Sequence, residues 1–316
     1  MLGLDFVRAN RETVERAIRD KGVGVDLGDL LALDTQIRAL KTEVEALRAE
    51  RNAISAQFPK APPEAKAELG RRAKEAGARV SALENQLSGE EAALNALMLQ
   101  LPGIPYEGAP VGPDESFNTV IRTEGQPPQF DFAPLDHVAL IEKNGWADLS
   151  GVTQVSGSRT YCLKGRLALL ETKLMGWALE GIANAGFTPI TVPAIAREQA
   201  FLNQGQFPGH KEETYELPND DLWLAGTAEV VLTSLHSGEI IEADKLPVLY
   251  ACYSPCFRRE AGSAGKDVRG LLRVHQFVKV EQYVICEADD AQSAEWHAKL
   301  LGLAEQLLQA LEIPIR

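Results

Sequence analysis

Cysteine is scarce in this sequence, with four residues in a chain of 316. The closest pair, Cys252 and Cys256, lies in a segment with the composition of a β-strand. Structural zinc sites usually place cysteine pairs closer together on loops, with further ligands elsewhere in the chain. We therefore expect packed, reduced thiols rather than a zinc site, which suits a reducing compartment.

Long apolar runs and an excess of basic residues are lacking as well. No run is long enough to span a membrane, and the first twenty residues are charged throughout, unlike a secretory leader. The 32 Lys/Arg against 45 Asp/Glu give a formal net charge of -13, which argues against non-specific binding through a basic surface. We expect a cytoplasmic protein that binds neither membrane nor DNA.

The pattern that is present begins with heptads. After a short amphipathic helix at about 5–20, apolar residues recur at alternating spacings of three and four over 30–58, with Arg51 as the charged exception. The pattern breaks at the prolines of 59–63 and resumes over 69–101, which predicts two long helices in an antiparallel hairpin. At about 1.5 Å per residue each helix would reach some 45 Å, so the hairpin should protrude. Periodicity alone also allows part of an ordinary helix bundle.

A stretch rich in proline and glycine, 101–116, marks a domain boundary. We expect an N-terminal domain over 1–103 with the hairpin at about 28–100, a linker over 104–120 and a second domain over 121–316. The second domain should contain helices near 165–185 and 290–312, an extended run at 186–196 and a strand-rich region at 222–284. Without a regular βαβ alternation, this composition predicts an α+β fold around an antiparallel sheet flanked by helices.

Charged and aromatic side chains that could bind a substrate are most concentrated in the segment 253–285. We expect two antiparallel strands joined by a loop at about 261–272. The period of two puts Arg258 and Glu260 on one face of the first strand. On the second strand, one face should carry Arg273, His275, Phe277, Lys279 and Glu281.

A solvated row of charges is the plain interpretation of such a face. The same groups also suit the formation of an adenylate: arginine binds phosphates, an aromatic ring stacks on adenine, and a carboxylate binds an ammonium or hydroxyl group. That reaction needs positioning and charge neutralisation rather than a protein nucleophile.

The string FRREAGSAGKDVRGLLRVHQFVKVE, residues 257–281, resembles motif 2 of class II aminoacyl-tRNA synthetases in its seryl form. The helix at about 165–185 followed by GFTPITVPAIA at 186–196 resembles motif 1, and WLAGTAEVVLTSLHSGEII at 223–241 resembles the seryl TAE loop. The segment 155–171 is similar to the one that leads into motif 1, and the hairpin is similar to the family's tRNA-binding arm. The resemblance covers essentially the whole chain.

The resemblance implies the following roles. The catalytic residues would be Arg258, Glu260 and Arg273. ATP would be bound by Arg258, Arg259, Glu260, Arg273, Val274 and Phe277, with Phe277 stacked on adenine. Serine would be bound by Thr227, Ala228, Glu229, Arg258 and Glu281. Magnesium would accompany ATP, with Glu281 as a ligand.

The implied partners are L-serine, tRNA(Ser), tRNA(Sec) and a second copy of the chain, which would meet it through motif 1 around Pro193. Contacts to tRNA are expected from Arg38, Lys41, Arg48, Arg71, Arg72, Lys74, Lys266 and Arg269. Helix-surface charges are commonly paired with one another, so only part of this set should touch RNA.

Several alternatives stay open at this point. Thr227 could serve only as the N-cap of the helix that follows it, and His275 could be a hydrogen-bonded structural residue. No counterpart of motif 3, a helix-borne arginine of the family, stands within the 316 residues. The chain is therefore either part of a serine-tRNA ligase or an inactive paralogue that serves as an RNA-binding or dimerisation module.

Overall fold

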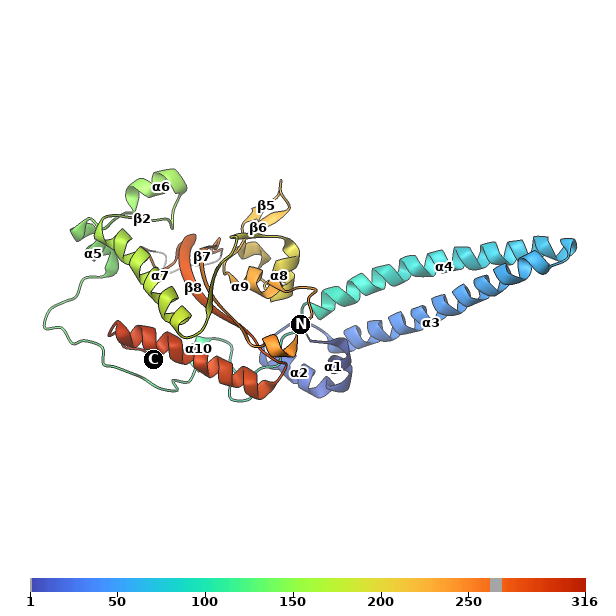
Figure 1. Cartoon of the computed structure of the whole chain (residues 1–316), viewed down its shortest axis with the longest axis horizontal. Helices are drawn as coiled ribbons and strands as arrows, with labels where there is room; N and C mark the ends of the chain where they lie inside the picture. The colour runs from blue at the N-terminus through green and yellow to red at the C-terminus, as the bar shows by residue number, and fades with distance from the viewer. Residues whose placement is uncertain (1, 262–268) are drawn as a thin grey trace. The chain divides into compact units, whose positions relative to one another are not determined.

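The computed structural model describes residues 2–261 and 269–316. The chain divides into two compact units, Met1–Asn118 and Thr119–Arg316, and each is described by itself. Figure 1 labels the helices and strands of both units. No helix in the described part of the chain is both long and apolar enough to cross a membrane.

The first unit is helical. Its elements are α1 (Leu4–Ala9), α2 (Arg11–Asp20), α3 (Leu27–Gln57), α4 (Pro63–Met98) and the 3-10 turns η1 (Phe58–Lys60) and η2 (Glu115–Phe117). Helices α3 and α4 form the expected hairpin (Figure 1), and its seam buries residues of the heptad positions, among them Ile37, Val44, Ile54, Val80 and Leu94. Helix α4 starts at Pro63, earlier than the resumed heptads suggest, because a proline at the first helical position has no hydrogen bond to lose.

The hairpin base is held by one buried carboxylate. Asp34 on α3 accepts hydrogen bonds from Arg8 Nε at 2.9 Å and Arg8 Nη2 at 2.6 Å, while Arg38 Nε lies 3.2 Å away. The hydrogen bonds from Arg8 lower the pKa of Asp34. Since Arg8 belongs to α1, this pair ties the N-terminal helix to the hairpin.

The second unit mixes helices with short and long strands. The helices are α5 (His137–Asn144), α6 (Ser150–Ser156), α7 (Arg166–Asn184), α8 (Glu198–Gln204), α9 (Glu229–Leu235) and α10 (Asp290–Ala310), with 3-10 turns η3 (Lys211–Glu213) and η4 (Ala243–Lys245). The strands are β1 (Ala147–Asp148), β2 (Cys162–Leu163), β3 (Thr188–Thr191), β4 (Ile195–Ala196), β5 (Glu216–Leu217), β6 (Leu222–Leu224), β7 (Val248–Phe257) and β8 (Gln276–Ile285). The predicted α+β class is confirmed.

A three-stranded sheet with the order β3-β7-β8 forms the centre of this unit. Strands β7 and β8 pair antiparallel over ten residues, as expected, whereas β3 runs parallel to β7. Ala251 of β7 packs with Ile182 of α7, and with Val280 of β8 and Trp296 of α10 at the margin of the cluster. Cys252 packs on the opposite face against α9. One face of the sheet is therefore covered by α7 and α10, and the other faces α9.

The expected strands differ from the observed ones at their inner ends. Strand β7 ends at Phe257 and β8 begins at Gln276, so Arg258, Glu260, Arg273 and His275 lie outside the strands that should carry them. Glu260 has φ +52°, a left-handed conformation that cannot continue a β-strand. Phe277, Lys279 and Glu281 do remain in β8, and their spacing of two keeps them on one face.

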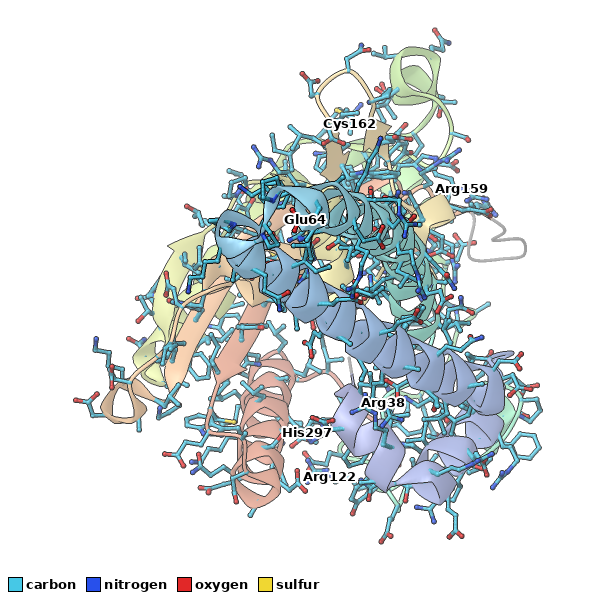
Figure 2. The ribbon with its side chains drawn as sticks, turned by 90° about the vertical axis from the view of Figure 1, so that its right-hand side faces the viewer. Arg38, Glu64, Arg122, Arg159, Cys162 and His297 are labelled. Atoms are coloured by element: carbon cyan, nitrogen blue, oxygen red, sulfur yellow. The ribbon has the colours of Figure 1, made fainter. Side chains whose placement is uncertain are left out.

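The cysteines are free thiols, as expected. Cys252 and Cys256 are buried in β7, whereas Cys162 is exposed in β2 and is labelled in Figure 2. Within the described ranges no group of three His, Cys, Asp or Glu side chains is arranged to hold a metal ion.

Candidate active site

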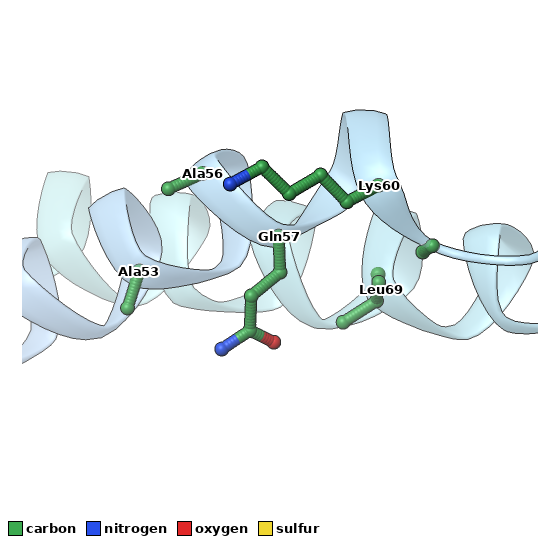
Figure 3. Close-up of a pocket in the computed structure, with 6 residues that line it drawn as sticks. Ala53, Ala56, Gln57, Lys60 and Leu69 are labelled. Carbon is green, nitrogen blue, oxygen red and sulfur yellow. The ribbon is translucent and has the colours of Figure 1, made fainter.

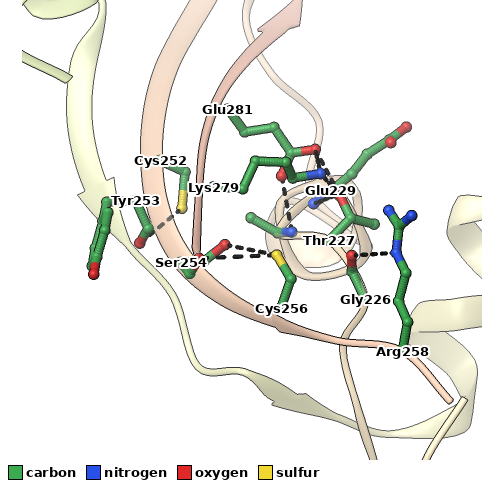
Figure 4. Close-up of polar contacts among 11 residues, drawn as sticks. Gly226, Thr227, Glu229, Cys252, Tyr253, Ser254, Cys256, Arg258, Lys279 and Glu281 are labelled. Atoms are coloured by element: carbon green, nitrogen blue, oxygen red, sulfur yellow. Dashed lines mark hydrogen bonds and ion pairs between the residues drawn. The ribbon is translucent and has the colours of Figure 1, made fainter. Parts of the chain in front are cut away.

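Three polar side chains meet on the face of the sheet that α9 covers (Figure 4). Thr227 Oγ1 lies 2.5 Å from Glu281 Oε1, and the Lys279 ammonium donates to both atoms at 2.7 Å. The other carboxylate oxygen, Glu281 Oε2, accepts the Ala228 N–H at 2.9 Å. Hydrogen bonds therefore join Thr227 and Ala228, which precede α9, to Glu281 of β8.

Strand β7 leaves room for this cluster. The residues directly opposite Glu281, Lys279 and Phe277 in the ladder are Cys252, Ser254 and Cys256, all small and all buried. Side chains on directly paired residues of a ladder are neighbours on the same face. Small residues at alternate positions of one strand thus leave space for longer polar side chains of the next, and this C-x-S-x-C alternation was a signal that sequence reasoning missed.

The N-cap interpretation of Thr227 is not supported. The N-cap of α9 is Ala228, and no side chain caps this helix. The Thr227 hydroxyl is instead bonded to Glu281 and Lys279, with only a long contact of 3.4 Å from the Glu229 N–H. The Thr227 hydroxyl is therefore engaged in the cluster with Glu281 and Lys279 rather than in capping α9.

Arg258 follows directly on β7 and is anchored at both its backbone and its side chain. Its N–H donates to the His275 carbonyl at 2.9 Å, and its Nε donates to the Gly226 carbonyl at 3.3 Å. The guanidinium lies over the Phe277 ring, 5.1 Å from the centroid, a favourable cation-π geometry. A Cβ at residue 226 would lie 3.2 Å from the Phe257 carbonyl oxygen and 3.3 Å from Arg258 Cγ, so glycine permits this close approach.

His275 is bonded within the protein. Its Nδ1 lies 3.0 Å from the Arg258 carbonyl oxygen, so Nδ1–H is the donor, and the ring meets Tyr215 edge-on with centroids 6.1 Å apart. Its backbone N–H donates to the Arg159 carbonyl at 3.0 Å. These contacts favour the structural interpretation of His275.

Arg159 is a residue that the sequence did not single out. Besides accepting from His275, it donates through Nη1 to the Glu260 carbonyl at 2.7 Å. Arg159 and Glu260 both have positive φ, +58° and +52°. Two residues with strained backbones are therefore hydrogen-bonded to each other close to Arg258. The Glu260 carboxylate in turn lies 3.5 Å from Arg273 Nη1.

The remaining expected residues are less closely grouped. The Arg259 N–H donates to the Glu213 carbonyl at 2.8 Å, and Val274 is buried. Arg269 lies 3.7 Å from Asp136 at the start of α5. Lys266 lies outside the described residues.

Burial of the β7 thiols has an electrostatic consequence. It raises the pKa of Cys252 to about 11, with the Glu281 carboxylate adding to the shift, and it also raises the pKa of Cys256. Both groups therefore remain uncharged thiols at neutral pH.

The expected RNA-contact residues of the hairpin are mostly paired with carboxylates. Ion pairs join Arg38 to Asp34, Lys41 to Glu91, Arg48 to Glu84, Arg71 to Glu68 and Glu75, and Arg72 to Glu50. Lys74 makes no ion pair within the described part of the chain. Three of these bridges, those of Lys41, Arg48 and Arg72, cross between α3 and α4.

An open hollow lies at the hairpin tip (Figure 3). Its lining residues are Ala53, Ala56, Gln57, Lys60, Ala61 and Leu69. Three of the six are alanines, so the hollow arises where small side chains face the turn, and Lys60 is its charged group. None of the residues expected to bind ATP or serine lines it.

The antiparallel β7-β8 pair, with the arginines at its inner ends and the carboxylate in β8, has the arrangement expected of motif 2 in a class II aminoacyl-tRNA synthetase. In agreement, residues 213–316 match the tRNA synthetase class II core domain (G, H, P, S and T), and residues 1–105 match the seryl-tRNA synthetase N-terminal domain.

The particular family follows from whole-chain similarity. The serine-tRNA ligase of Deinococcus radiodurans is 51% identical over 316 residues, which are 100% of this chain and 74% of that protein. The serine-tRNA ligase of Corynebacterium glutamicum is 39% identical over 317 residues, with the same coverage of 100% and 74%. The chain belongs to the serine-tRNA ligase family and spans about three quarters of the length of these relatives.

Solved structures agree with this assignment. The seryl-tRNA synthetase of Pyrococcus horikoshii complexed with ATP matches with a TM-score of 0.89 and 34% identity, over 99% of this chain and 75% of that one. The cytoplasmic serine-tRNA ligase of Naegleria fowleri in complex with AMP matches with a TM-score of 0.81 and 26% identity, over 98% and 72%. The chain is thus an aminoacyl-tRNA synthetase of the serine-tRNA ligase family.

Proposed function

We propose that the residues around β7 and β8 bind ATP and serine and promote formation of seryl-adenylate. The carboxylate oxygen of serine would attack the α-phosphorus of ATP, and pyrophosphate would leave. The observation that carries this proposal is the Thr227-Lys279-Glu281 cluster, which lies on the sheet face shared with Phe277 and next to Arg258.

Each group has a role that its chemistry supports. Arg258 would neutralise charge at the α-phosphate and the serine carboxylate, with Arg259, Glu260 and Val274 beside the nucleotide. Arg273 would hold the outer phosphates and Phe277 would stack on adenine. Thr227, Ala228, Glu229 and Glu281 would line the serine pocket. Arginine suits the phosphates because its planar fork binds anionic oxygens in pairs, and in-line transfer depends mainly on such positioning.

Magnesium fits this residue set poorly at Glu281. Magnesium takes oxygen ligands in a near-ideal octahedron, whereas Glu281 Oε1 already accepts from Thr227 and Lys279 and Oε2 accepts from Ala228. An ammonium at 2.7 Å would also repel a second cation. We therefore assign Glu281 to serine and derive no step from a metal held by this residue.

The test is serine-dependent exchange of pyrophosphate into ATP, measured on the 316-residue chain and on a protein extended to the length of its relatives. We expect exchange in the longer protein and a loss of at least about 100-fold in R258A, because one charge-assisted contact to the transition state is typically worth about 3 kcal/mol. Absence of exchange from both proteins, together with absence of serine binding, would favour the inactive paralogue.

We also propose partners beyond the small molecules. The hairpin would bind the backbone of tRNA(Ser), and of tRNA(Sec), with Lys74 among the contacts. Arg269, in the loop between β7 and β8, would approach the acceptor end of the tRNA. A second copy would meet the chain through the motif 1 region around Pro193, since Leu169 and Leu170 of α7 are 63% and 57% exposed. The expected compartment is the cytoplasm. Light scattering of the wild type and of L169E would test the dimer.

A further inference from the structure

We propose that Lys279 is a positioning residue. It would determine which groups of the serine pocket donate and which accept hydrogen bonds, and thereby the preference for serine over alanine. This inference rests on the proposed function of the site. It begins from a closed triangle of contacts, in which the Lys279 ammonium reaches Thr227 Oγ1 and Glu281 Oε1, both at 2.7 Å, and these two atoms lie 2.5 Å apart.

The direction of each hydrogen bond in the triangle is fixed by chemistry. An ammonium group can only donate, so the Thr227 hydroxyl accepts from Lys279. A carboxylate can only accept, so the single hydrogen of that hydroxyl is directed to Glu281. Lys279 thus determines where the Thr227 hydrogen points, because without it the hydroxyl could rotate and offer its hydrogen to a ligand.

Counting lone pairs shows what is left for a substrate. Glu281 Oε1 receives two hydrogen bonds and is saturated, whereas Oε2 receives only the Ala228 N–H, at 2.9 Å, from the residues that the structure describes. One acceptor position therefore remains on Oε2, and the third N–H of Lys279 is not used by either contact of the triangle. The position on Oε2 selects an amino acid that brings one further donor there, such as a side-chain hydroxyl.

The triangle is also partly shielded from water. The Glu281 side chain is 17% exposed and that of Lys279 is 29% exposed. Buried Ser254 lies opposite Lys279 in the ladder. An ion pair in such a place is stronger than one at the surface, and removal of one partner leaves the other charge uncompensated.

The experiment is steady-state pyrophosphate exchange in the protein extended to the length of its relatives, comparing wild type, K279M, K279R and the control K299M. Lys299 pairs with Glu295 on the exposed side of α10, away from the site. We expect K279M to raise the KM for serine by about 10- to 100-fold, the size of one or two lost charged hydrogen bonds. The KM for ATP should change less than threefold.

Two further readouts separate positioning from general support of the fold. The ratio of kcat/KM for serine over alanine should fall by about tenfold or more in K279M, and K279R should restore at least part of it because guanidinium also donates. K299M should match the wild type. A double-mutant cycle with T227V should be non-additive, since both changes break the same triangle.

The outcomes are distinguishable from failure of the proposed function. Wild type without serine-dependent exchange would remove the proposed function itself. Active wild type with K279M within twofold of it would overturn only the positioning role. Equal increases in both KM values, with a lowered unfolding temperature and no rescue by K279R, would also overturn it, because Lys279 would then merely stabilise the fold.

Discussion

Among single residues, burial decides which thiols react. The thiolate is the reactive form of cysteine, and burial raises the pKa of Cys252 to about 11. At pH 8 only about 0.1% of such a group is ionised, against roughly a tenth for a thiol with the ordinary value near 9.

We therefore expect iodoacetamide at pH 8 to modify exposed Cys162 within minutes and to leave Cys252 and Cys256 unmodified in the folded protein. All four cysteines should react in denaturant, which serves as the control. Peptide mass spectrometry reads out each position. Rapid labelling of Cys252 in the folded state would contradict its burial.

Asp34 gives a prediction about stability. The Arg8 hydrogen bonds lower its pKa in the folded state, from an ordinary value near 3.8. A carboxyl group whose pKa is depressed by folding stabilises the protein above its unfolded pKa, and this contribution is lost as the pH falls below about 4.

D34N should therefore destabilise the first unit at pH 7 by about 2 kcal/mol, the size of hydrogen bonds to a charged group that are lost. The difference from wild type should shrink as the pH is lowered from 5 to 3. Urea denaturation followed by circular dichroism measures both effects. Exposed Glu45, replaced by Gln, is the matched control on the same helix and should change stability by less than about 0.5 kcal/mol.

For the hairpin as an element, packing should outweigh ion pairing. Ile54 is 3% exposed in the seam, whereas the bridge between Arg79 and Glu43 is formed by side chains that are 66% and 46% exposed. I54A should cost about 2–4 kcal/mol. R79A should cost at most about 1 kcal/mol. Hydrogen exchange of α3 and α4 amides would measure both, and equal effects would contradict this ranking.

The junction between motif 2 and α5 supplies another test. Gly270 has φ +85°, and a Cβ there would lie 2.0 Å from His137 Nε2, the atom that accepts the Leu271 N–H at 3.2 Å. G270A should lower the unfolding temperature and increase exchange of the Leu271 amide. Adding H137A should recover only part of the loss, because Val138 Cγ2 would still lie 2.7 Å from the added Cβ and the backbone strain of about 1–2 kcal/mol remains. Full recovery would show that the positive φ is not strained.

The sequence predicted elements well wherever one period dominates. The heptads of 30–58 identified α3, and the alternation in 276–285 placed Phe277, Lys279 and Glu281 on one face. It failed at Glu260 and Arg159, because a left-handed backbone at a non-glycine residue is held by tertiary hydrogen bonds that no local pattern reveals. The triangle of Lys279, Glu281 and Thr227 could not be predicted for a similar reason. Lys279 and Glu281 lie 52 and 54 residues from Thr227 in the sequence, so no local pattern connects them.

At the scale of the whole molecule, the net charge of -13 disfavours binding of RNA, which is also negatively charged. RNA binding therefore depends on basic side chains that are not already paired with carboxylates. Arg71 is already bonded to two carboxylates, while Lys74 makes no ion pair among the described residues. K74A should weaken binding of tRNA(Ser) severalfold and reduce the salt dependence of log K by about one ion. R71A should have the smaller effect. Filter binding across a salt series checks this, and the reverse order would show that the Arg71 pairs open on binding.

The heptad packing between α3 and α4 also limits which changes in helix length the hairpin can accept. Seven residues added to each helix restore the same face and lengthen the arm by about 10.5 Å, whereas three or four added residues advance it by about 5 Å and shift the register of the seam. The reach of this arm can therefore change by whole heptads while its tip keeps its orientation. The lengths of such hairpins in related proteins should therefore differ by multiples of seven residues per helix rather than by arbitrary numbers.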